Sequence, residues 1–225
     1  MRPIFRFFAP LIATILLILP AQASVLVTSM GKPNVLAFTI DDLNWRAGKF
    51  QAAGSSLDVS SIEIRGQLNA GSGGDLIARI YSHHVSDRPD VAIGGTFDIS
   101  SFTGGPSDFL FPINTPGSTV LSAGTTYWLV LGTTNASFDM SWTCTNVGGS
   151  DSGPGTIFET ISTCSDCNVG GTSWTTVSSP TLTDFPKFAV NVVPEPSTYA
   201  AIFGLFSLVA VIGMRFIQQR KLVTS

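Results

Sequence analysis

Residues 62–68 read Ile-Glu-Ile-Arg-Gly-Gln-Leu, and their alternation decides the fold class. Apolar side chains stand at positions 62, 64 and 68, and polar ones at 63, 65 and 67. Because successive side chains of a β-strand point to opposite faces, this stretch is a strand with one core face and one solvated face. The same alternation recurs four times, at 76–80, 109–113, 138–142 and 188–192.

Turn-forming residues separate these stretches. Runs rich in Gly, Pro, Asn and Ser occur at 69–74, 104–107, 115–117 and 148–153. The interior has few Lys and Glu residues, and no convincing amphipathic helix lies between the strands. The sequence therefore predicts an all-β domain, an antiparallel β-sandwich with a jelly-roll-like arrangement.

The first 23 residues have the parts of a cleavable signal peptide. Two arginines precede the apolar run 7–19, and Ala21 and Ala23 then supply the small-x-small pattern that signal peptidase reads. We expect cleavage after Ala23, so that the mature chain begins at Ser24. The alternative is an uncleaved membrane anchor, which the shortness of the run disfavours.

The C-terminal residues have the parts of a membrane tail. Pro194, Glu195 and Pro196 precede an apolar run from 199 to 217. As a helix this run would be about 28 Å long, close to the ~30 Å hydrocarbon core of a bilayer. The basic residues at its end are Arg215, Arg220 and Lys221. We expect one transmembrane helix at 199–217.

Charge is segregated between the ends and the interior. The whole chain has a formal net charge of −3, but the stretch from Ser24 to Val193 has 14 acidic and seven basic residues, a formal charge of −7. Nucleic acid is excluded as a partner on this ground, since phosphate binding needs a basic patch. The basic ends place the acidic domain outside the cytoplasm by the positive-inside rule.

The C-terminal tail also resembles a known family of signals. Val193-Pro194-Glu195-Pro196, one apolar helix and a basic end are similar to the PEP-CTERM sorting signal. Proteins with that tail are cleaved by exosortase, a membrane-embedded cysteine transpeptidase of Gram-negative bacteria that make exopolysaccharide. The resemblance implies that Pro194, Glu195 and Pro196 are the recognition element and that the basic cluster is the stop-transfer signal. An ordinary single-span anchor is the alternative.

The interior resembles a second family, the choice-of-anchor R domains. The matching strings lie at 50–64 and 80–89, and above all at 121–131, Leu-Ser-Ala-Gly-Thr-Thr-Tyr-Trp-Leu-Val-Leu. The resemblance covers roughly residues 38–192 and implies no established activity.

The three cysteines are candidates for a disulfide, since disulfides persist in exported proteins. Cys164 and Cys167 form a C-x-x-C motif, and Cys144 is the third cysteine. Either a local bridge or one from Cys144 fits the sequence. The surrounding Gly, Ser and Thr residues do not offer the βαβ setting of a thioredoxin-like site, and zinc would need one of His83 or His84 from far along the chain. We expect these histidines in a polar loop.

Two kinds of side chain suggest ligands. Aspartates at 41, 42, 87, 90 and 151 are oxygen donors of the type that Ca²⁺ prefers, but none has EF-hand or repeat spacing. Four aromatic side chains could form a platform for stacking on a sugar ring, namely Tyr127, Trp128, Trp142 and Trp174, with Trp142 and Trp174 as the candidates. Tyr127 and Trp128 lie in an apolar strand, so at least one of these two rings is expected in the core. Core packing is the favoured alternative for the set.

The sequence thus divides into a signal peptide at 1–23, an extracytoplasmic β-domain at 24–192 and a sorting tail at 193–225. We expect signal peptidase and exosortase as partners, membrane attachment before processing, and a cell-surface or matrix location afterwards. The expected role is non-enzymatic, structural or exopolysaccharide-binding, without a cofactor. The alternative is a hydrolase of matrix polysaccharide, which needs two carboxyl groups about 5 to 10 Å apart in a cleft.

Overall fold

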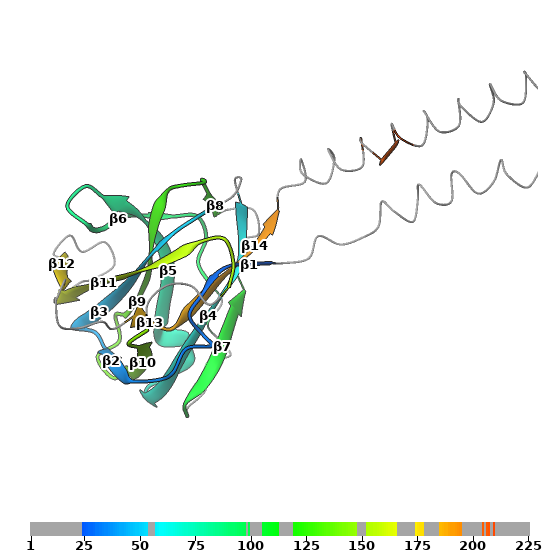
Figure 1. The fold of residues 1–225 in the computed structure, drawn as a ribbon. Coiled ribbons are helices and arrows are strands. Elements are labelled where there is room, and N and C mark those ends of the chain that lie inside the picture. The colour runs from blue at the N-terminus through cyan, green and yellow to red at the C-terminus, as the bar shows by residue number, and fades with distance from the viewer. Residues whose placement is uncertain are drawn as a thin grey trace, which may run out of the picture.

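A computed structural model describes most of the chain between residues 24 and 194. The described residues are 24–53, 57–97, 99, 105–112, 119–147, 152–165, 174–177 and 185–194, together with 204, 206, 207 and 209. Within 24–194 they form strands β1 to β14 and one short 3-10 helix, η1 (Gly73–Asp75). The strands make two curled antiparallel sheets, so the all-β prediction is confirmed (Figure 1).

The first sheet has eight strands among the described residues. Its main path runs in the order β1 (Ser24–Thr28), β14 (Phe188–Pro194), β4 (Leu57–Ala70), β10 (Asp139–Thr145) and β13 (Phe185–Pro186). Off this path, β10 also pairs with β2 (Leu36–Ile40), and β4 with β7 (Ser107–Pro112) and β8 (Val120–Leu121). Among the described strands, the last, β14, is therefore an inner strand of the sheet, next to the first, β1.

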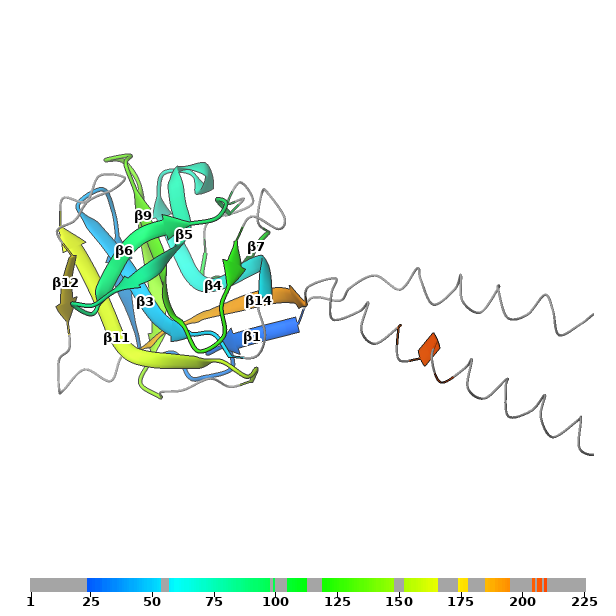
Figure 2. The ribbon, with the colours of Figure 1, turned by 90° about the horizontal axis from the view of Figure 1, so that it is seen from above.

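The second sheet has six described strands. They run in the order β12 (Trp174–Val177), β11 (Thr156–Ser165), β3 (Asn44–Gln51), β9 (Thr126–Thr133), β5 (Leu76–His84) and β6 (Arg88–Ile93). This sheet curls so strongly that its two edge strands, β6 and β12, contact each other. Figure 2 shows β6 passing across the sheet toward β12. The curl creates a second interior besides the space between the sheets.

Strand β4 shows how the alternation is kept over a long strand. Leu57 and Val59 are buried, and the buried phase then shifts by one residue to Ile62 and Ile64. The shift coincides with a β-bulge against β14, at Ser60. Because a bulge inserts one extra residue, it returns the following side chains to the same face. Both halves of β4 therefore face the core.

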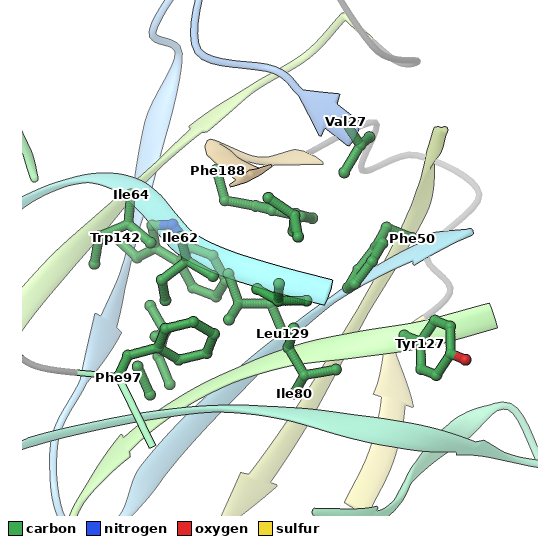
Figure 3. Close-up of a cluster of buried hydrophobic side chains, with 14 of the residues drawn as sticks. Val27, Phe50, Ile62, Ile64, Ile80, Phe97, Tyr127, Leu129, Trp142 and Phe188 are labelled. Atoms are coloured by element: carbon green, nitrogen blue, oxygen red, sulfur yellow. The ribbon is translucent and has the colours of Figure 1, made fainter. Parts of the chain in front are cut away.

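The main core lies between the two sheets. Phe188 of the eight-stranded sheet meets Phe50 of the six-stranded sheet edge to face, with ring centroids 5.9 Å apart, and lies 6.2 Å from the Trp142 ring (Figure 3). Burying each such side chain contributes about 1.5–3 kcal/mol. These rings join the layers into one unit.

A second cluster of apolar side chains fills the curl of the six-stranded sheet. Along β9, Tyr127, Leu129 and Leu131 face the main core, and Trp128 and Val130 face the opposite way. The buried members of this second cluster are Trp45, Ala47, Tyr81, Trp128, Val130 and Cys164. The sheet is therefore apolar on both faces at its centre.

Candidate functional site

The two ends of the domain lie side by side. β1 and β14 are antiparallel neighbours, and Ser24 is the register partner of Val192. β14 continues to Pro194, whose partner is Leu57 of β4. The predicted boundary at residue 192 thus falls inside a strand, and the first proline of the predicted sorting motif belongs to the sheet. Other predicted processing residues lie outside the described residues: Ala21, Ala23, Glu195, Pro196, Arg215, Arg220 and Lys221.

Little of the predicted transmembrane run is described. Gly204, Phe206, Ser207 and Val209 are helical. Phe206 and Val209 are both more than half exposed. In the part of the chain that the structure describes, no helix has the length and apolar character needed to cross a membrane.

The cysteines separate into two environments. Cys164, in β11, is disulfide-bonded and buried in the second cluster. Cys144, in β10 of the other sheet, is buried and its thiol donates to the Trp142 carbonyl at 3.6 Å. Cys167 lies outside the described residues.

The tryptophans differ in burial, and this corrects one prediction. Trp142 is completely buried in the main core, and its Nε1 donates to the carbonyl of Lys187 at 3.0 Å. Trp142 is therefore wrong as a candidate for sugar stacking, because alternation along β10 turns its ring inward. Trp174 is half-buried and packs against the second cluster. Tyr127 and Trp128 are both buried.

A polar group that the sequence did not reveal fastens the β5–β6 hairpin over the six-stranded sheet. Asp87, in the turn, has a φ of 57° and forms an ion pair with Lys49 of β3. The Lys49 Nζ lies 5.7 Å from the Trp128 ring centroid and 5.1 Å from that of Phe158. Trp128 Nε1 donates to His83 Nδ1 at 3.1 Å. We call Lys49, His83, Asp87, Trp128 and Phe158 the hairpin cluster.

His83 serves packing in this cluster. Burial lowers the pKa of His83, and the positive charge of Lys49 lowers it further, against the opposing effect of Asp87. The neutral ring is thus favoured, and its Nδ1 is already engaged as an acceptor. The expectation of a polar loop was wrong, since His83 and His84 end strand β5.

A second polar group lies on the solvent-facing side of β4 and β7. Arg65 Nε and Asp108 Oδ1 are 3.0 Å apart. Burial raises the pKa of Glu63, and the neighbouring charge of Asp108 raises it further. The raised pKa makes Glu63 easier to protonate than an isolated glutamate side chain. The pair was not visible in the sequence because only the strand register brings position 63 near position 108.

Lys187 is a buried lysine that the sequence also did not indicate. It connects β13 to β14, and its side chain is completely covered. Its Nζ donates to the Lys32 carbonyl at 2.5 Å and to Asn34 Oδ1 at 2.7 Å. These bonds fasten the loop before β2 onto the end of the main core, which is a structural role.

Two of the candidate calcium donors, Asp41 and Asp87, have other partners in the structure. Asp41 Oδ1 accepts from the amide of Leu43 at 2.9 Å and from Asn44 Nδ2 at 2.8 Å, which shapes the turn before β3. Asp87 pairs with Lys49, and Asp151 lies outside the described residues. No three His, Cys, Asp or Glu residues are grouped as a metal site within the described ranges.

Comparison with models of known protein families and with curated proteins finds no match to this chain.

Proposed function

We propose that this chain is an exported protein of the cell envelope or exopolysaccharide matrix, processed by an exosortase-type enzyme, with a mainly structural role. The observation that carries the proposal is the junction between domain and tail. β14 runs directly into the Pro-Glu-Pro motif, and the expected mature start, Ser24, is paired with Val192. Both ends that the sequence directs to the membrane thus leave the domain together.

The junction also sets the distance between domain and bilayer. Only residues 195–198 separate Pro194 from the apolar run that starts at Tyr199. Four residues span at most about 14 Å when fully extended. Before processing, the domain is therefore held against the inner membrane, and cutting the tail moves it to the cell surface or the matrix.

The structural role is favoured over glycan binding by where the aromatic side chains lie. Trp45, Trp128 and Trp142 are buried, so they stabilise the fold. Only the half-buried Trp174 offers part of a ring to a sugar among the four tryptophans. The two curled sheets are compatible with the jelly-roll-like β-sandwich that we propose for the domain.

Replacement of Pro194, Glu195 and Pro196 by alanines in the native host tests the proposal. The apolar run is untouched, so membrane insertion should continue while processing fails and the uncut chain accumulates in the inner membrane. Intact-mass measurement of each fraction distinguishes cut from uncut chains. Ser197→Ala is the matched control and should be processed. Native protein that keeps Ser225 and remains wholly membrane-bound would contradict the proposal.

The second candidate function, a hydrolase of matrix polysaccharide, rests on Glu63 and Asp108. Glycoside hydrolysis uses two carboxyl groups about 5 to 10 Å apart. Burial and the neighbouring Asp108 raise the pKa of Glu63, as a general acid in such a pair requires. If this function is correct, Glu63→Gln should abolish the release of reducing sugars from the host exopolysaccharide, while Asp139→Asn leaves it unchanged. The hydrolase function is rejected if the two variants release equal amounts of reducing sugar, or if the unmodified protein releases none.

A further inference from the structure

We propose that the folded domain withholds the start of the sorting motif, so that the processing enzyme cuts only molecules in which the end of β14 has opened. This inference rests on the proposed function, because it concerns regulation of the same processing site. It follows from the position of Pro194 inside the sheet.

β14 is held on both sides along most of its length. β1 pairs with it from Thr28, opposite Ala189, to Ser24, opposite Val192. On the other side β4 pairs with it as far as Pro194. The last two residues are therefore held by β4, through the pairs Val193–Asp58 and Pro194–Leu57.

The β4 residues of these two pairs, Leu57 and Asp58, are held in place by neighbouring strands. Leu57 is buried, and it pairs across its other edge with Leu121 of β8, which is also buried. The adjacent Val59 amide donates to the Thr119 carbonyl at 2.9 Å. Exposing Pro194 therefore requires β14 to leave β4, since β4 is held from the far side.

An enzyme that cuts a peptide chain binds it in extended form and uses its backbone hydrogen-bonding groups, as strand addition does. Residues 193 and 194 are already aligned with β4 in that way. Opening of a strand end costs much less than global unfolding. The opened fraction of β14 ends thus sets the processing rate, and anything that stabilises these last pairs slows the cut.

A disulfide across the last pairs tests this in the full-length chain in its host. Register partners in an antiparallel pair have Cα atoms about 4.5–5.5 Å apart, within the range that a disulfide spans. Asp58→Cys with Val193→Cys should therefore close β14 onto β4. We expect the oxidised variant to accumulate uncut. Adding reductant to the isolated membranes should restore cutting. The reduced protein has the same sequence as the oxidised protein, so it serves as the control.

A second disulfide locates the part of β14 that must open. Asn191 Nδ2 donates to Ser61 Oγ at 3.1 Å, so Ser61→Cys with Asn191→Cys closes the strand three residues before Pro194. It leaves the end free to open, and processing should continue. If both disulfides block processing, the folded domain still withholds the motif, but a longer part of β14 than its last residues must open before the cut.

The outcomes separate this inference from the proposed function. Normal cutting of the 58–193 variant, with its disulfide verified by peptide mapping, overturns the inference and leaves the proposed function intact. A wild-type chain that is never cut overturns the proposed function and the inference with it. Hydrogen exchange of the Val193 amide gives an independent check, because exchange as fast as in an unstructured peptide would show that β14 does not hold the motif.

Discussion

At the scale of single residues, His83 makes a prediction about pH. Its pKa is lowered by burial and then by Lys49, with Asp87 opposing and His84 adding a small further decrease. In the unfolded chain His83 has a pKa of about 6.5, so on acidification it binds a proton at a higher pH than it does in the folded protein. The contribution of His83 to the free energy of unfolding should be complete above about pH 6.5. It should fall as the pH decreases from about 6.5 toward the lower pKa of His83 in the folded protein. Urea unfolding at pH 7.5 and pH 5.5 measures the loss.

The His83→Gln variant isolates this contribution from other titrating groups. Glutamine cannot be protonated, so the difference between wild type and variant should depend on pH, with the wild type losing more stability on acidification. A raised pKa such as that of Glu63 acts in the opposite direction, because its contribution is lost as the pH rises. A pH-independent difference would contradict the role assigned to His83.

Residue type alone predicts burial poorly where partners come from distant segments. Lysine is among the least buried residue types, so the covered position of Lys187 could not be anticipated. Its acceptors lie more than 150 positions away, in the loop before β2. Trp142 shows the converse, because its large ring suggested a ligand platform, but the strand turns it into the core.

At the scale of elements, strands with one wet face were predictable from their alternation, and β9 from its apolar run, whereas β3 was not predicted. The five alternating stretches coincide with β4, β5, β7, β10 and β14 to within one residue at an end. In β3 the face opposite the main core carries Trp45 and Ala47, both buried, followed by Lys49. This pattern does not alternate between apolar and polar, because the curl of the sheet buries its outer face.

The curl makes a prediction at Gly132, where β9 passes under the Trp45 indole. A Cβ at this position would lie 2.0 Å from the nearest atom of that ring. Trp45 is held by its Nε1, which donates to the Thr133 carbonyl at 2.9 Å, so it cannot move away freely. Gly132→Ala should destabilise the protein by about 1–3 kcal/mol through overpacking. Chemical denaturation measures the loss.

Gly74→Ala is the matched control, since the nearest atom to a Cβ there is 3.8 Å away, in ordinary contact. The same substitution should therefore change the unfolding free energy little at this surface position. Equal effects at positions 74 and 132 would show that the curl is not tightly packed at Trp45.

At the scale of the whole molecule, the position of β14 makes completion of the fold depend on the end of the domain. β14 lies between β1 and β4, so the eight-stranded sheet cannot be completed until the end of the domain has been delivered. Pairing of the first strand with the last is also the longest-range contact that a chain can make, and such contacts form slowly. If the proposed function is correct, the order of events is export of the whole domain, closure of β14, and then processing of the tail when the end of β14 opens.

Truncation tests this dependence. Phe188, Val190 and Val192 are buried, and burying them contributes about 5–9 kcal/mol together, comparable to the total stability of a typical domain. A chain of residues 24–187 should therefore fail to fold, while one of residues 24–194 should unfold cooperatively. The fluorescence of the buried tryptophans reports both states, because they are exposed to water only on unfolding. Cooperative unfolding of the shorter chain would mean that β1 and β4 close the sheet without β14, and then the end of the domain could not control when the tail becomes available.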